Sequence, residues 1–429
     1  MIAGSPDRLG GAAPDRPPGV RVVLDARPLQ APDRSPLAAT YLDGLLGAYD
    51  ARPLAGESFA FLLASDLDDP TDAFSHLDIV GRRQLPPTRL LRSGALTVDP
   101  FVLRGAAIGA AWRAERGGAA GAVYHAVGGG PLPIASGIPV VVTLLDLAPW
   151  ELPEAFGRTV VNRFGQRLRA QLLREAAAVI VGSDATARAA RKVLRIRRDR
   201  LHVVPLAPRP GFAPPTDADD EGSDARAMRA VRDRLGLGDR YLVFSGRFDA
   251  RMDLGTLLSA LADLARVGRP GGLSTDVPWP PRVLIVGASP DDRASVARAA
   301  ARKGIGESLV YAPSLPTEDL AGLVRGARAA VSPVVSEAAG LPVIEALACG
   351  IPVVGSAVGP LPELIGPAGL LVPPRDPDRL AVALATVWAD DEVHGSIASM
   401  ALEAARRESR DWADVADETR RVYAAVGAA

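Results

Sequence analysis

Residues 332–355 read SPVVSEAAGLPVIEALACGIPVVG, a pattern of strand, loop, helix and second strand. The first strand is predicted to end near Ser332, and the loop that follows carries Glu337. The helix is predicted to begin at Leu341, and the second strand to occupy residues 352–355. Alternation of strand and helix in this order predicts a parallel sheet covered by helices.

The start of the predicted helix has the features of an anion site. Gly340 lets the backbone approach a ligand closely, and Pro342 stands in the first turn, where a proline is tolerated. The free amides and the positive end of the helix dipole suit a diphosphate. Glu337 and Glu345 flank this position, where one carboxylate can bind a ribose and the other a transferred sugar. The residue types alone favour the alternative, a helix N-terminus with a favourably placed acid on each side and no ligand.

The same alternation extends from this stretch through the chain. In the first half, a helical pattern spans residues 36–49, and apolar runs of strand length lie at residues 20–26, 59–64, 122–125, 139–145, 178–182 and 201–205. In the second half, such runs lie at residues 241–245, 282–287, 309–312, 329–332, 352–355 and 369–372. We therefore expect two Rossmann-like α/β domains whose parallel sheets face each other across a cleft, because open α/β sheets bind ligands at the carboxyl ends of their strands.

Shifts in composition divide the chain into five parts. Residues 1–19 are rich in Pro, Gly, Asp and Arg and are expected to form a disordered leader. Residues 20–208 and 240–408 are expected to be the two domains, joined by a polar linker at 209–239 with a short helix inside it. Residues 409–429 contain an amphipathic helix that is expected to pack back toward the first domain.

The composition excludes several classes of protein. The length of 429 residues suits two domains, and although 48% of the residues are hydrophobic, no run approaches a membrane-spanning helix of roughly 20 apolar residues. A formal net charge of -1 disfavours nucleic acid as a partner. The single cysteine, Cys349, excludes an internal disulfide and a thiolate metal cluster and fits a reducing compartment. We therefore expect a cytoplasmic protein.

Residues 332–355 closely resemble the Glu-x7-Glu signature of the family-4 retaining glycosyltransferases, which usually reads Glu-Gly-Phe-Gly-Leu-Pro, two residues, Glu-Ala. The resemblance continues through residues 349–350, 352–354, 361–363 and 369–372. It is weaker at residues 25–28, which look like the end of the first strand in the mannosyltransferase-like branch of the family. Further weak matches lie at residues 183–184, 246–247 and 412–423.

The resemblance implies a GT-B fold and a retaining, metal-independent hexosyltransferase that needs no cofactor. Such an enzyme would move a hexose from a GDP- or UDP-sugar, its co-substrate, to a glycan or lipid-linked acceptor in polysaccharide biosynthesis. Residues 240–408 would then hold the nucleotide sugar, and residues 20–208 would bind the acceptor.

The resemblance also implies roles for individual residues. Glu345 would hold the nucleotide ribose, Glu337 would face the hydroxyls of the donor sugar, and Arg247 would neutralise the diphosphate leaving group. Charge grows on that group as the glycosidic bond breaks, so a fixed guanidinium there contributes more in the transition state than in the ground state. Arg247 and Glu337 are therefore the predicted catalytic residues. The other predicted donor-binding residues are Arg251, Gly340, Leu341 and Pro342.

Four segments depart from the family pattern. Residues 251–252 read Arg-Met where the family usually has Arg-Lys, and residues 145–147 read Leu-Asp-Leu where it commonly has His-Asp-Leu. Residues 30–41 contain no glycine for close approach to the donor phosphates, and residues 338–339 read Ala-Ala instead of Gly-Phe. These departures leave two alternatives: a catalytically impaired protein that binds nucleotide sugars, and a sugar-nucleotide epimerase or phosphorylase on the same fold.

Two residues of the first half are further candidates for acceptor or donor contacts. His125 follows a predicted strand and resembles a histidine that faces the cleft, although a structural role fits it equally. Asp146 can orient a substrate hydroxyl or cap the backbone after its strand. No metal site is predicted, because Asp66 and Asp68 have no supporting ligands nearby in the sequence.

Arginines recur along residues 157–175 with apolar residues between them. This pattern is typical of a helix on an anionic membrane surface, which would be the inner face of the plasma membrane, and also of a solvated helix face, which is the simpler interpretation. The arginines are Arg158, Arg163, Arg167, Arg169 and Arg174.

Overall fold

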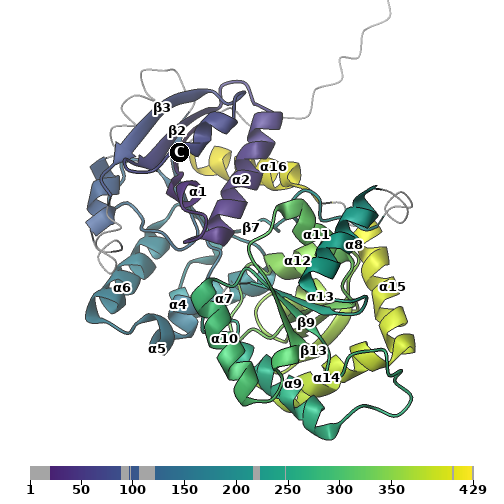
Figure 1. The fold of residues 1–429 in the computed structure, drawn as a ribbon. Coiled ribbons are helices and arrows are strands. Elements are labelled where there is room, and N and C mark those ends of the chain that lie inside the picture. Colours follow the sequence, from purple (N-terminus) through teal and green to yellow (C-terminus); the bar gives the residue numbers. More distant parts are fainter. Residues whose placement is uncertain are drawn as a thin grey trace, which may run out of the picture.

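The structure of the protein, a computed structural model, describes residues 20–87, 96, 98–105, 121–215, 223–246, 248–407 and 410–427. These residues form two α/β domains side by side, and the last helix returns to the first domain (Figure 1). The prediction of two domains with parallel sheets is confirmed. The predicted leader, residues 1–19, lies outside the described part of the chain.

The first domain contains a seven-stranded sheet in the order β3-β2-β1-β4-β5-β6-β7, in which all strand pairs are parallel. Its strands are β1 (Arg21–Asp25), β2 (Ser58–Ala64), β3 (Ile79–Leu85), β4 (Ala122–Val127), β5 (Val140–Thr143), β6 (Ala178–Val181) and β7 (Leu201–Val203). Its helices include α1 (Arg27–Gln30), α2 (Pro36–Ala51), α4 (Ala148–Glu151), α5 (Pro153–Phe156), α6 (Val160–Glu175) and α7 (Asp184–Leu194). Apolar runs form the central strands because helices cover both faces of such a sheet.

The sequence patterns missed one strand of this sheet, β3. It lies at the edge of the sheet and pairs with β2, and its side chains are mostly exposed or half-buried, including the exposed Arg82 and Arg83. An edge strand has one side without a neighbour, and charged side chains there discourage pairing with another chain. A search for apolar runs therefore cannot detect it.

The second domain contains a six-stranded parallel sheet in the order β10-β9-β8-β11-β12-β13. Its strands are β8 (Leu242–Ser245), β9 (Val283–Val286), β10 (Leu309–Ala312), β11 (Ala329–Ser332), β12 (Val353–Ser356) and β13 (Gly369–Val372). Its helices are α8 (Ser223–Leu235), α9 (Leu254–Val267), α10 (Pro290–Arg302), α11 (Thr317–Arg325), α12 (Leu341–Ala348), α13 (Leu361–Ile365), α14 (Pro377–Ala389) and α15 (Asp391–Arg407). The strand runs predicted from the sequence all lie in this sheet, and α8, within the expected linker, packs against α11.

The strand order reverses at one place in each sheet, between β1 and β4 and between β8 and β11. At such a point the loops that follow the two strands diverge and leave a crevice at their carboxyl ends, where open α/β sheets bind ligands. In the second domain the register pairs Ala330 with Val243, so the loops after Ser245 and after Ser332 leave the sheet next to each other.

Two crossing segments connect the domains, and they are hydrogen-bonded to each other. Residues 205–212 lead into the second domain, and residues 410–412 lead back. The Arg410 guanidinium donates to the Pro205 carbonyl at 2.9 Å, and the Trp412 indole donates to the Pro208 carbonyl at 3.0 Å. The last helix, α16 (Trp412–Gly427), packs against α2 (Figure 1).

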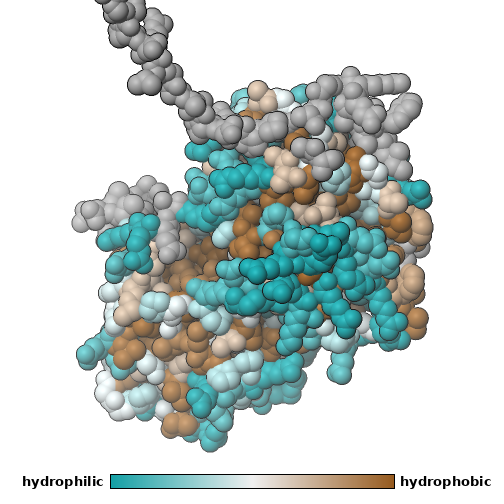
Figure 2. Space-filling view, turned by 180° about the vertical axis from the view of Figure 1, so that it is seen from behind, coloured by the Kyte–Doolittle hydropathy of each residue, from teal (hydrophilic) through white to brown (hydrophobic). Residues whose placement is uncertain are grey.

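The helices of the described ranges differ from membrane-spanning helices in length or in polarity. Every helix in the described ranges is too short or too polar to span a membrane. The side opposite to the view of Figure 1 mixes hydrophilic and hydrophobic residues, with a broad hydrophilic area across its middle (Figure 2).

His125 joins α16 to the first sheet, and its predicted position in the cleft is wrong. The imidazole is fully buried, with Nε2 2.8 Å from the Thr143 hydroxyl and Nδ1 2.6 Å from the Tyr423 hydroxyl of α16. Burial lowers its pKa to about 3, so the ring is neutral at physiological pH. Nearby, Arg420 of α16 forms a buried bidentate ion pair with Glu57 at 3.0 and 2.7 Å. His125 therefore stabilises the fold and does not face a ligand.

The neutral state of His125 predicts that the fold loses stability in acid. The unfolded chain takes up this proton below about pH 6.5 and the folded chain only below about pH 3, so protonation favours unfolding between these values. This site alone is expected to cost up to about 1.4 kcal/mol of unfolding free energy per pH unit as the pH falls from 6.5. Urea unfolding of the wild type and of His125→Gln, which keeps hydrogen-bonding groups and does not titrate, measures the difference between pH 7.5 and pH 5. Equal pH slopes for the two proteins would contradict the role of His125.

Candidate functional site

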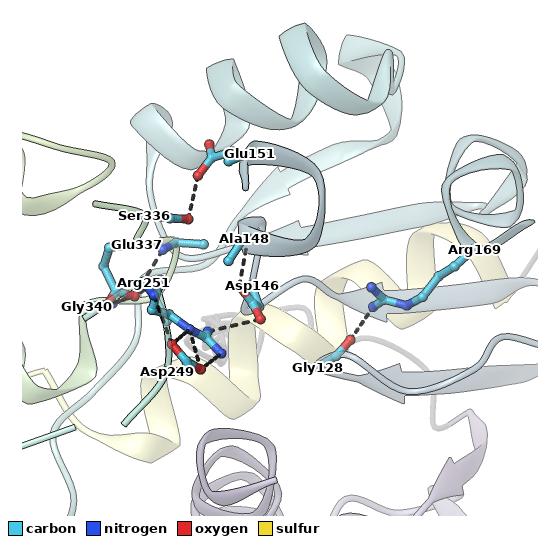
Figure 3. Close-up of polar contacts among 12 residues, drawn as sticks. Gly128, Asp146, Ala148, Glu151, Arg169, Asp249, Arg251, Ser336, Glu337 and Gly340 are labelled. Atoms are coloured by element: carbon cyan, nitrogen blue, oxygen red, sulfur yellow. Dashed lines mark hydrogen bonds and ion pairs between the residues drawn. The ribbon is translucent and has the colours of Figure 1, made fainter. Parts of the chain in front are cut away.

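The loop between β11 and α12 carries the first glutamate of the signature. Gly340 adopts a left-handed conformation with φ of 71°, and α12 begins at Leu341, as predicted. Oε1 of Glu337 accepts hydrogen bonds from the backbone N–H groups of Ala338, Ala339 and Gly340 at 2.9 to 3.0 Å (Figure 3). Burial raises the pKa of Glu337, and the three amides oppose that rise. Of the amides predicted to bind an anion, that of Gly340 is thus occupied by the chain's own carboxylate.

A small recess lies between α12 and the sheet of the second domain, where the strand order reverses. Its lining includes Ser245 of β8, Ser332 of β11 and Pro342 of α12, together with apolar side chains. The loop of Glu337, the start of α12 and this recess therefore share the place where a doubly wound sheet binds ligands.

The second glutamate of the signature, Glu345, is paired with Arg209. The guanidinium binds both carboxylate oxygens, with Nε 2.5 Å from Oε1 and an Nη atom 3.0 Å from Oε2. The Glu345 side chain is 4% exposed and the Arg209 side chain 25% exposed. Burial raises the pKa of Glu345, and the hydrogen bond and charge of Arg209 counteract it. Sequence patterns did not identify Arg209, because it lies in the expected linker, 136 residues before its partner.

The predicted phosphate cation Arg251 is held by two carboxylates, one from each domain. It contacts Asp249 through Nε and an Nη atom at 2.9 and 2.7 Å, and Asp146 of the first domain at 3.0 Å (Figure 3). Burial lowers its pKa, but the hydrogen bond to Asp249 and the charge of Asp146 outweigh this effect and raise it. Asp146 also accepts a hydrogen bond from the Ala148 amide at 2.9 Å, so it caps the backbone as well as pairing across the interface.

The loop of Glu337 is docked into the first domain. Ala338 and Ala339 are 3% and 4% exposed and pack with the core of the first domain. The Thr186 hydroxyl donates to the Ala338 carbonyl at 2.8 Å, and the Ser336 hydroxyl donates to the Glu151 carboxylate at 2.6 Å (Figure 3). The two alanines that replace Gly-Phe are therefore the residues by which the loop enters the first domain.

On the first-domain side, Arg169 of α6 is a buried residue and not part of a solvated helix face. It donates to the carbonyl of Gly128 (Figure 3) and to that of Gly130, and it lies over the Trp150 ring at 5.1 Å. Burial lowers its pKa to about 10. Arg169 thus supports the glycine loop after β4, whereas the side chains of Arg163 and Arg167 are exposed.

Not every predicted residue belongs to this cluster. Glu337, Gly340, Arg251 and Asp146 lie together at the interface (Figure 3), and Glu345 lies further along α12. Arg247, the predicted catalytic arginine, lies outside the described residues. Among the described residues, no group of three or more His, Cys, Asp or Glu side chains is arranged to hold a metal ion.

Residues 239–390 match the family model described as glycosyl transferases group 1. A D-inositol 3-phosphate glycosyltransferase from Xylanimonas cellulosilytica is 30% identical over 285 residues, which are 65% of this chain and 62% of that protein. The chain thus spans less than two thirds of this relative's length.

Among solved structures, sucrose-phosphate synthase from Thermosynechococcus elongatus superposes with a TM-score of 0.66 at 21% identity, covering 94% of this chain and 98% of the other. HepE from Anabaena, in complex with UDP, superposes with a TM-score of 0.60 at 18% identity, covering 95% of this chain and 100% of the other. These similarities extend over both domains. The two parallel-sheet domains and the superpositions over both of them show that the chain has the GT-B fold, and its residues 239–390 are similar to the glycosyl transferases group 1.

Proposed function

We propose that the protein is a glycosyltransferase that moves a hexose from a nucleoside diphosphate sugar to a hydroxyl group of an acceptor. The observation that carries the proposal is the position of the two glutamates beside the second switch point. Glu337 lies in the loop before α12 that docks against the first domain, and Glu345 lies within α12. A donor bound there would face a first-domain surface, and closure between domains excludes water from the reacting groups.

The donor contacts follow from the chemistry of these side chains. The Glu345 carboxylate suits the two hydroxyls of a ribose, and Arg251 and Arg247 suit the diphosphate. Stabilisation of the departing diphosphate by fixed cations lowers the barrier to breaking the glycosidic bond. Because Arg247 is not among the described residues, its role rests on the family resemblance, as do retention of configuration and independence of metal ions.

The nature of donor and acceptor is proposed from the relatives. HepE was solved with UDP, and the D-inositol 3-phosphate glycosyltransferase acts on an inositol phosphate by its name. UDP- and GDP-hexoses are therefore the donors to test first, and inositol 3-phosphate is the first acceptor, followed by glycan and lipid-linked acceptors. The first domain would set acceptor choice through the loops at its own switch point between β1 and β4.

One alternative is favoured by a specific observation. Arg251 is paired with Asp146 and Asp249, and Met252 follows it where relatives of the family usually have a lysine. A protein with fewer free cations at the diphosphate would bind nucleotide sugars and stabilise the leaving group poorly. Incubation with UDP- and GDP-hexoses, with and without acceptors, separates the two: free nucleoside diphosphate accumulates for a transferase, and binding without release identifies the impaired protein.

Peripheral contact with a membrane is part of the proposal. The first half of α6 exposes Val160 by 71% and Phe164 by 59%, and Arg163 and Arg167 lie on the same side of the helix by their spacing. Apolar side chains flanked by arginines suit insertion into an anionic lipid surface. The acceptor would then be reached at the membrane, in a protein located on its cytoplasmic side.

Removal of the Glu345 carboxylate is expected to weaken nucleotide binding. Glu345→Ala loses charge-assisted hydrogen bonds to the ribose, which corresponds to roughly a 10- to 100-fold rise in Kd for UDP or GDP. Isothermal titration calorimetry measures the change, and the exposed Glu318→Ala at the start of α11 is the control. Unchanged affinity in a folded Glu345→Ala protein would rule out this assignment.

Replacement of Arg247 is expected to affect turnover more than binding. Arg247→Ala should lower kcat on the order of 100-fold, because the cation acts mainly on the charge of the transition state, while the Kd of the nucleotide sugar changes less than about tenfold. Release of nucleoside diphosphate measures kcat, and the exposed Arg266→Ala on α9 serves as the control. Equal losses in binding and turnover would assign Arg247 to ground-state binding.

Disruption of the apolar face of α6 is expected to reduce lipid binding. Phe164→Glu should lower partitioning onto vesicles that contain phosphatidylglycerol by about tenfold, by removing one inserted ring and adding a like charge to the lipid. Co-sedimentation measures bound protein, with phosphatidylcholine vesicles as the neutral surface. Val267→Glu, which changes a still more exposed apolar side chain at the end of α9, should have no effect. If the wild-type protein does not co-sediment with anionic vesicles, the proposed membrane contact is refuted.

A further inference from the structure

We propose that Arg209 is a displaceable cover over Glu345, so that the ribose of the donor reaches this carboxylate only when the guanidinium swings away. The inference rests on the proposed function, in which Glu345 binds the ribose. It assigns to a residue of the interdomain crossing the task of setting how tightly the protein binds a nucleotide and how strongly it distinguishes ribose from 2′-deoxyribose.

The geometry of the ion pair supports the proposal that the Arg209 guanidinium covers the Glu345 carboxylate. Both oxygens of Glu345 are bound by Arg209, and the carboxylate side chain is only 4% exposed, whereas the Arg209 side chain is 25% exposed. The guanidinium also lies over the Phe212 ring at 5.0 Å. A ligand hydroxyl approaching from solvent therefore meets the guanidinium before the carboxylate.

Replacement of the Arg209 guanidinium at Glu345 by a neutral group, such as a ribose hydroxyl, is unfavourable. A guanidinium forms two parallel charge-assisted hydrogen bonds with a carboxylate, and this geometry is among the strongest in proteins. Two ribose hydroxyls can replace the hydrogen bonds but not the opposite charge. Arg209 is thus expected to lower nucleotide affinity, and the carboxylate becomes fully available to the ribose only when the pair is broken.

The position of Arg209 in the chain connects this exchange to the two segments that cross between the domains. Arg209 directly follows Pro208, whose carbonyl accepts the hydrogen bond of the Trp412 indole from the returning segment. The two crossing segments are also joined by Arg410 and Pro205. Release of the guanidinium from Glu345 would therefore remove one of the links between the crossing segment and α12, so ribose binding would change how the two domains are connected.

The arrangement at Arg251 follows the same principle with the charges reversed. Asp146 of the first domain and Asp249 hold the cation that is proposed to meet the diphosphate. A phosphate oxygen would replace the Asp146 carboxylate there, as a ribose hydroxyl would replace the Arg209 guanidinium at Glu345. Both proposed donor contacts thus carry an intramolecular partner of opposite charge.

The test compares the binding of UDP, GDP and their 2′-deoxy analogues to the wild type and to Arg209→Ala by calorimetry. The variant is expected to bind UDP or GDP about tenfold more tightly, because no ion pair has to be broken, and to bind the 2′-deoxy analogue with little gain. The affinity for the ribonucleotide divided by that for the 2′-deoxy analogue should therefore be higher in the variant than in the wild type. Arg209→Lys keeps the charge but cannot bind both oxygens in parallel, so its ratio should lie between those of the wild type and Arg209→Ala.

A matched control separates this effect from a general loosening of the interface. Arg188→Ala removes the exposed ion pair between α7 and Glu363, 2.6 Å in length, and should leave nucleotide affinity and the deoxy ratio unchanged. Thermal unfolding shows whether each variant is folded. If Arg209→Ala does not fold, Arg209→Lys takes its place in the comparison. Wild type and folded Arg209 variants with equal affinities and equal deoxy ratios would overturn the cover while leaving the proposed function intact. A lack of nucleotide binding by every protein tested would overturn both, and binding by the Arg209 variants alone would support the cover.

Discussion

The arrangement of the site depends on one contact, the docking of loop 336–340 into the first domain. Ala338 and Ala339 are buried against the core of that domain, and the Ala338 carbonyl accepts the hydrogen bond of Thr186. Directly afterwards Gly340 turns into a left-handed conformation, and α12 begins. This φ strains any residue with a side chain, and a Cβ at position 340 would also come within 2.6 Å of the end of the Leu364 side chain, so the turn favours glycine. The first domain thereby holds the loop of Glu337, whereas α12, which carries Glu345, packs in the core of the second domain.

The second constraint is that each buried charge of the site is paired with hydrogen-bond donors or with an opposite charge. A charge taken out of water needs hydrogen bonds or an opposite charge, and a large loss of stability follows when one partner of such a pair is removed. Glu337 is satisfied by three amides, Glu345 by Arg209, and Arg251 by Asp146 and Asp249. A donor that binds among these groups replaces intramolecular partners with its own hydroxyl and phosphate groups. Its affinity therefore reflects the difference in free energy between the intramolecular contacts and the contacts with the donor.

Sequence patterns predicted the parallel sheets because apolar runs of four to seven residues report burial on both faces of a strand. They failed where the decisive neighbour is far away in sequence. His125 has the context of a cleft residue, but Tyr423, 298 residues later, encloses it. Arg169 fits a regular series of surface arginines, yet its carbonyl partners in the glycine loop draw it into the interior. The edge strand β3 was not predicted, because its exposed positions carry polar residues and so form no apolar run.

By itself, the sequence determined the local facts: the start of α12 at Leu341, the spacing of Glu337 and Glu345, and the alternation that produces two doubly wound sheets. Steric limits, helix capping and hydrophobic periodicity act over a few residues, so a single stretch of chain is enough to express them. Only the tertiary structure decided that Arg209 covers Glu345 and that Asp146 reaches Arg251 across the interface. Ion pairs of this kind depend on distances between segments brought together by packing, and such distances have no signature in the local order of residues.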